Sequence, residues 1–175
     1  MIPRNILLVM LILIVSSCQS KKAVHLKTVL EQKERVVFNI LLGKNGPNEQ
    51  KLKCLIDGDF KCAQQAITEE ERAFDKIISE INALETGDIK YGNELKSATS
   101  NYYKAVKEFE IFDRLVIAQQ QISQNKKNTE KIRDAAIHKQ GQLSRERLEM
   151  RKTISKKEQL LAEVQKQFKL LNHLH

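Results

Sequence analysis

The sequence predicts an all-α protein, folded as an antiparallel helical bundle or as a long helical hairpin with coiled-coil-like packing. Composition is the first reason: the 175 residues include no Trp, 2 Pro and 6 Gly, and 30% of them are charged. A chain with so few helix breakers and so many Lys, Glu, Gln, Leu and Ile residues favours long helices. The second reason is that apolar residues recur at every third or fourth position over long stretches, which indicates helices with one apolar face. No segment shows the strict alternation of apolar and polar residues that is typical of strands.

A short apolar run follows Arg4 near the amino terminus. The ten residues 6–15 are all apolar, which is too few for a helix that spans a bilayer, since that takes about 20 residues. The run has the length of a signal-peptide core and has a positive charge in front of it. Two small residues, Ser16 and Ser17, then lead directly into Cys18.

This arrangement resembles the bacterial lipoprotein signal, in which an apolar residue and two small residues precede a cysteine that receives acyl chains. The resemblance implies that residues 1–17 are removed and that Cys18 carries diacylglycerol and a further acyl group such as palmitate. It therefore implies a lipid-anchored protein of the bacterial cell envelope. Gln19 stands where an aspartate would favour the inner membrane, so we expect the outer membrane. Residues 18–25 would form a short lipidated tether and residues 26–175 a single helical domain.

Four helices are expected in that domain. They cover residues 24–42, 68–86, 93–116 and 142–171, and Gly43, Gly87 and Gly141 stand at three of the boundaries. The second helix is expected to begin with a capping box, in which the Thr68 hydroxyl accepts from a backbone N–H and Glu71 reaches back to the helix start. Arg147 and Lys157 interrupt the apolar face of the fourth helix, and we expect them to face carboxylates of a neighbouring helix.

The third and fourth helices have apolar positions spaced three and four residues apart, as in packed helix pairs. The positions are Leu95, Ala98, Tyr102, Ala105, Phe109, Phe112 and Val116 in the third, and Leu143, Met150, Ile154, Leu161, Val164, Phe168 and Leu171 in the fourth. We assign the aromatic members of the third helix to the core rather than to a ligand pocket. Residues 119–129 contain one apolar residue in eleven; they form a loop or a projecting helix, and the Asn and Thr residues that suit helix caps favour the loop.

Two cysteines remain after the lipidated one, and they frame a turn. Cys54 and Cys62 would lie about 12 Å apart in one straight helix, too far for a disulfide. The sequence Asp57-Gly58-Asp59 favours a turn between them, which would bring them together. Because an exported protein meets conditions that permit disulfides, we predict a structural bridge. The alternative is a pair of ordinary core cysteines.

No pattern in the sequence indicates catalysis, a cofactor or a metal. The histidines at positions 25, 138, 173 and 175 are scattered, and Asp57-Gly58-Asp59 lacks the ligand spacing of a calcium loop. Nucleophile elbows, phosphate-binding glycine loops and His-Glu-x-x-His motifs are all missing. We therefore expect a protein that is not an enzyme and that has neither cofactor nor metal.

The positive charge of the chain is concentrated in its last 50 residues. Residues 126–175 hold 13 basic and 6 acidic side chains, whereas residues 18–125 are balanced and the whole chain carries +8. Such a region can meet an acidic host protein or a glycan. Nucleic acid is not expected, because the protein is exported and few aromatic residues stand among the charges. The residues expected to form this surface are Lys126, Lys127, Arg145, Arg151, Lys152 and Lys156. The alternative is a solvated helix face that keeps the protein soluble.

The leader, the lipid-attached cysteine and the Lys/Asn/Gln/Ile-rich helices together resemble the small plasmid-encoded surface lipoproteins of Borrelia, and among them an Orf-D-type family. The resemblance implies a helical lipoprotein, some relatives of which bind host molecules. We therefore expect a membrane-anchored surface binding or adhesion protein, with oligomers through the helical faces as an option. The alternatives are a periplasmic holdase and a structural envelope spacer.

Overall fold

The computed structural model describes the backbone of residues 4–174 and the side chains of residues 21–174. It contains α1 (Arg4–Leu42), α2 (Pro47–Ile56), α3 (Phe60–Asn82), α4 (Gly92–Ile111), α5 (Asp113–Gln124) and α6 (Glu130–Leu171). These described residues include no strand, so the predicted all-α fold is confirmed. The proposed leader and the side chain of Cys18 lie outside the residues whose side chains are described. Across the described part of the chain, no helix has both the length and the hydropathy that a membrane crossing requires.

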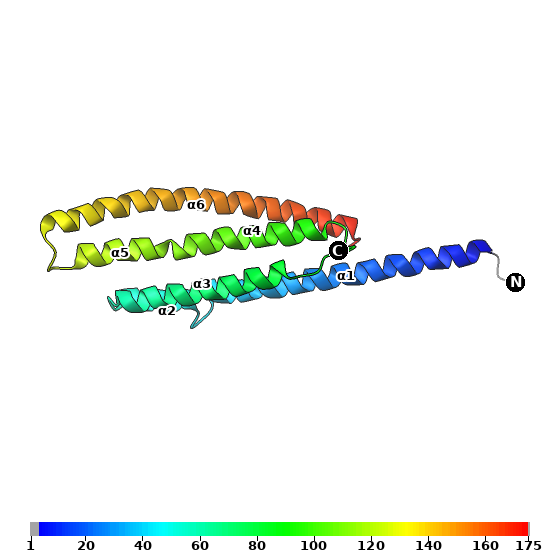
Figure 1. Ribbon diagram of the computed structural model, residues 1–175, viewed down its shortest axis with the longest axis horizontal. Coiled ribbons are helices and arrows are strands. Elements are labelled where there is room, and N and C mark those ends of the chain that lie inside the picture. The colour runs from blue at the N-terminus through cyan, green and yellow to red at the C-terminus, as the bar shows by residue number, and fades with distance from the viewer. Residues whose placement is uncertain (1–3, 175) are drawn as a thin grey trace.

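The helices form an elongated bundle of two layers (Figure 1). One layer contains α1, its continuation α2, and α3, which runs back beside them; the other contains α4, its continuation α5, and the returning α6. The 42 residues of α6 span about 63 Å at 1.5 Å per residue. α1 begins at one end of the molecule, and the connection between α5 and α6 lies at the opposite end.

The core lies between the layers and follows the predicted apolar faces. Buried predicted positions are Leu26, Leu30, Val37, Ile40, Phe74, Ile77, Ile81, Leu95, Ala98, Ala105, Leu143, Leu161, Val164 and Phe168. Tyr102, Phe109, Phe112, Val116, Met150 and Ile154 are half-buried. Leu171 is 42% exposed, so its assignment to the core was wrong; at this end of α6 the buried positions are Phe168 and Asn172.

The second helix is capped nine residues earlier than the capping box predicted. Thr68 lies inside α3, and its hydroxyl donates to the carbonyl of Gln64 (3.1 Å). The residue that caps α3 is Asp59, whose carboxylate accepts from the backbone N–H of Cys62 (2.9 Å). The predicted box was wrong because no helix breaker stands between Phe60 and Thr68, and the buried face of the helix already includes Ala63.

The start of the last helix was also predicted too late. α6 begins at Glu130 and passes through Gly141 without interruption, and α5 extends to Gln124. Of residues 119–129, expected to be a loop, only residues 125–129 form one. A glycine inside a helix costs about 1 kcal/mol, and burial of Ala136 and Leu143 on either side of Gly141 outweighs that cost.

The structure joins Cys54 and Cys62 in the predicted disulfide, with their Cα atoms 5.6 Å apart. Cys54 lies in the last turns of α2 and Cys62 in the first turn of α3. Gly58 between them has a φ of 73°, in the left-handed region that glycine adopts without strain. The bridge closes the α2–α3 turn over a small apolar cluster that contains Ile67 and Ile117.

Candidate binding sites

The six basic residues singled out in the sequence are all exposed. Lys126 and Lys127 lie in the loop of residues 125–129, at the end of the molecule opposite the start of α1 (Figure 1). The other four, Arg145, Arg151, Lys152 and Lys156, lie on α6. We call these six residues the basic surface.

Two members of the basic surface already have partners within the chain. Lys152 pairs with Glu149 at 2.7 Å, and the guanidinium of Arg151 lies 5.6 Å from the ring centroid of Phe109. Lys126, Lys127, Arg145 and Lys156 form no ion pair with any residue whose side chain is described. These four are therefore the members most available to a partner.

Five ionisable side chains from five helices meet between the layers. The Lys51 ammonium, 2% exposed, lies 2.8 Å from Asp113 Oδ2, 3.4 Å from Glu110 Oε2 and 3.7 Å from Glu70 Oε2. Arg147 Nη1 lies 2.9 Å from Asp113 Oδ1, so this basic interruption of α6 does face a carboxylate of a neighbouring helix. No ion pair of Lys157 is found within the described side chains. The ion cluster (Lys51, Glu70, Glu110, Asp113 and Arg147) connects the two layers.

Burial and the neighbouring charges have opposing effects on the pKa values of Lys51 and Glu70 in the ion cluster. Burial alone would lower the pKa of Lys51, but the hydrogen bond to Asp113 and the attraction of the carboxylates outweigh it and raise that pKa. For Glu70, burial is the largest influence and raises the pKa to about 7, although nearby Lys51 acts in the other direction. Neither carboxyl oxygen of Glu70 has a hydrogen-bond partner among the described residues.

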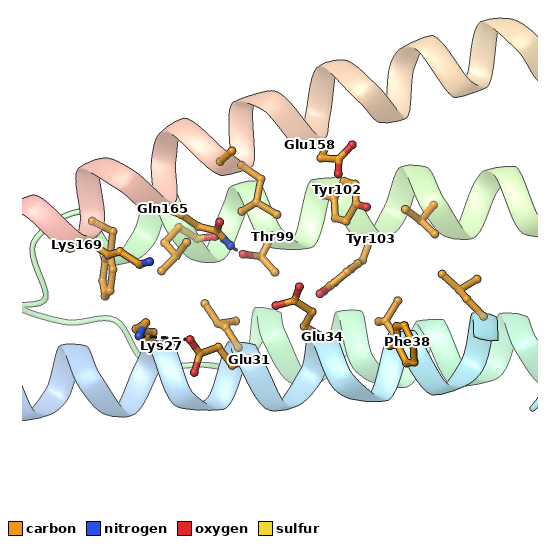
Figure 2. A pocket seen from close by; sticks show the side chains of 18 of the residues that line it. Lys27, Glu31, Glu34, Phe38, Thr99, Tyr102, Tyr103, Glu158, Gln165 and Lys169 are labelled. Atoms are coloured by element: carbon orange, nitrogen blue, oxygen red, sulfur yellow. Dashed lines mark hydrogen bonds and ion pairs between the residues drawn. The ribbon is translucent and has the colours of Figure 1, made fainter. Parts of the chain in front are cut away.

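A groove lies between α1, α4 and α6 (Figure 2). It has a volume of about 470 Å³, within the range of small-molecule sites. It exists because α1 and α6, in different layers, do not pack directly on each other in the described part of the chain, and α4 lies between them. Its apolar walls include Leu30, Val37, Leu161 and Phe168.

The middle of the groove is acidic and aromatic. Glu34 lies on the α1 side and Glu158 on the α6 side, with Tyr102 and Tyr103 of α4 between them (Figure 2). Burial raises the pKa of both tyrosines; Glu158 and Glu34 raise that of Tyr102 further, and Glu34 that of Tyr103. Both phenols are therefore neutral donors at physiological pH.

The sequence did not predict this groove. Tyr102 was assigned to the core, and it does pack against the core, but it also lines the cavity. Glu34 and Glu158 have the spacing of ordinary surface residues in their own helices. Only the relative placement of α1 and α6 brings them to one cavity, and a helical period does not specify that placement.

Comparison with known proteins gives no family for the chain. It matches no protein-family model, no curated protein and no solved structure. A function is therefore inferred from the charges and cavities of the described residues.

Proposed function

We propose that the chain is a non-enzymatic, lipid-anchored binding protein of a bacterial envelope, which meets an acidic partner through its basic surface. The observation that carries the proposal is that Lys126 and Lys127, which are exposed and form no ion pair within the described side chains, lie at the end of the bundle opposite the start of α1. A chain anchored near its amino terminus would present this end farthest from the membrane.

The length of the bundle supports this arrangement. α6 spans about 63 Å, whereas exposed charges are screened beyond about 8 Å at physiological ionic strength. The loop of residues 125–129 would therefore lie several screening lengths from the charges of a membrane surface. Binding there would depend on the partner's charges and would weaken as salt rises.

Charge reversal tests the basic surface. In the test variant, Lys126, Lys127, Arg145 and Lys156 are replaced by Glu. The control variant has the same change at Lys44, Lys61, Arg72 and Lys76, which are exposed and form no ion pair within the described side chains. Both variants have the same net charge, so a difference in their retention on an anionic column would depend on where the replaced charges lie.

We expect the test variant to elute from a heparin column at clearly lower salt than the control variant. We expect both to keep the melting temperature of the parent within a few degrees, because exposed substitutions usually change stability by under about 0.5 kcal/mol each. Elution of the two variants at the same salt would contradict the proposal, since retention would then reflect net charge alone.

A further inference from the structure

The groove between α1, α4 and α6 contains the hydroxyl of a largely buried tyrosine that has no hydrogen-bond partner among the described residues. Tyr103 is 4% exposed, and Figure 2 shows its hydroxyl pointing toward the Glu34 carboxylate inside the groove. No described residue forms a hydrogen bond with this hydroxyl, and its oxygen is not among the fully buried polar atoms without a partner, so it faces the open groove. A ligand with an N–H group would find in this oxygen an acceptor that no described side chain already occupies.

The centre of the groove also carries two solvent-exposed carboxylates. Glu34 and Glu158 form no ion pair with a described residue. The negative charge of Glu34 acts on both tyrosines, and that of Glu158 acts on Tyr102. The cations on the lining are elsewhere: Lys27 pairs with Glu31 at 3.4 Å. Lys169 lies at the same end as Lys27 in Figure 2, away from Glu158. Carboxylates and aromatic rings between apolar walls favour a cation.

The size and the apolar walls of the groove indicate what kind of group would be attached to the cation. An α-helix with its side chains is about 10–12 Å wide, and a cavity of about 470 Å³ is of small-molecule size. Buried Leu161 and Phe168 extend the apolar wall beyond the acidic centre. An aliphatic or aromatic group attached to the cation would cover this wall.

We propose that this groove is a binding site for a small amphipathic organic cation, whose ammonium group lies between Glu34 and Glu158 against Tyr102 and Tyr103, and whose apolar part lies along the α6 wall. The site is separate from the basic surface and does not depend on it. The ammonium is the charge complement of the two carboxylates. A primary or secondary ammonium would in addition give the Glu34 carboxylate and the Tyr103 hydroxyl a hydrogen-bonding partner.

Isothermal titration calorimetry of the full-length chain tests the site with three matched probes. They are hexylammonium, hexanoate, which has the same chain and the opposite charge, and methylammonium, which has the charge without the chain. We expect saturable binding of hexylammonium, at least tenfold tighter than binding of either comparator. Equal binding of hexanoate would show a crevice without charge selectivity and would overturn the proposal, as would the absence of saturable hexylammonium binding.

Substitutions then place the probe in the groove. Glu34→Gln with Glu158→Gln keeps the size of both side chains and removes their charge, so we expect hexylammonium affinity to fall at least tenfold. Glu69→Gln with Glu146→Gln makes the same change at two exposed positions outside the groove and should leave the affinity unchanged. Circular dichroism melting verifies that each variant is folded. An unchanged affinity in the groove variant, or an equal loss in the control variant, would show that the site is not here.

Discussion

Lys51 is the residue whose surroundings differ most from what its type suggests. A lysine in the sequence Gln-Lys-Leu-Lys-Cys has the pattern of a surface side chain, yet Lys51 is 2% exposed and faces three carboxylates. With Arg147, the ion cluster contains two cations and three acids. Burial raises the pKa of Glu70 to about 7, so at mildly acidic pH Glu70 is protonated and the cluster is neutral.

Glu70 should make the protein less stable as pH rises through the mildly acidic range. Its pKa is about 7 in the folded protein and 4.5 without the environment of the fold. Between these values the folded chain retains a proton that the unfolded chain has lost, so the free energy of unfolding falls with rising pH, by at most about 1.4 kcal/mol per unit. Below pH 4.5 this contribution is fully present, and above about 7 it is lost.

Glu70→Gln should remove this slope, because glutamine imitates the neutral acid and does not titrate. Urea unfolding, followed by circular dichroism at pH 5, 6 and 7, measures how the free energy of unfolding changes with pH. Glu69→Gln, at an exposed neighbouring position, is the control. We expect the parent and the control to lose stability over this range more steeply than Glu70→Gln. Identical slopes in all three proteins would show that Glu70 does not retain its proton.

At the scale of the element, helical period predicted the faces of the helices better than their ends. Leu26, Leu30, Val37 and Ile40 of α1 are buried as predicted, because a face is determined by many residues together. The predicted starts at Thr68 and after Gly141 each relied on one local signal. Packing over several turns outweighed both signals, and the two helices begin at Phe60 and Glu130.

Gly141→Ala should stabilise the protein. Gly141 lies inside α6, is exposed, and an added Cβ would meet no atom within 4 Å. Alanine is better than glycine in a helix by about 1 kcal/mol, so the melting temperature should rise by about 2–4 °C for a chain of this size. Differential scanning calorimetry measures the change. Gly58→Ala is the contrasting variant: its φ of 73° should make it less stable than the parent. A melting temperature of Gly141→Ala at or below that of the parent would contradict the expectation.

At the scale of the whole molecule, the sequence predicted the class of fold but not the neighbours of each helix. The apolar faces of α1 and α6 both contribute to one core, and nothing in either face specifies that the two helices stay apart. The groove depends on this arrangement and was not predicted. Of the ion cluster, only the pairing of Arg147 with a carboxylate of a neighbouring helix was predicted; the burial of Lys51 and Glu70 was not. The basic surface was predicted because exposure requires only that its residues lie off the apolar face.

The proposed anchor is tested on the whole molecule in cells. Cys18→Ala should abolish incorporation of radiolabelled palmitate and move the protein from the membrane fraction to the soluble fraction or the medium, because the thiol that receives the lipid is gone. Fractionation and labelling of parent and variant measure this, with Cys54→Ala as the control cysteine change. A variant that is still labelled would rule out Cys18 as the site of acylation.

Protease treatment of intact cells expressing the parent then distinguishes surface display from a periplasmic location.

The ion cluster has a consequence for the alignment of the two layers. Lys51 and Glu70 belong to one layer, and Glu110, Asp113 and Arg147 to the other. If the layers slid past each other by one helical turn, about 5.4 Å, most apolar side chains would meet other apolar side chains at modest cost. Lys51 would instead lose Asp113 and Glu110 and keep only Glu70 of its own layer, and breaking a buried ion pair by separating its partners costs several kcal/mol. The cluster thus selects a single longitudinal register among packings that the apolar faces alone would leave nearly equal in energy.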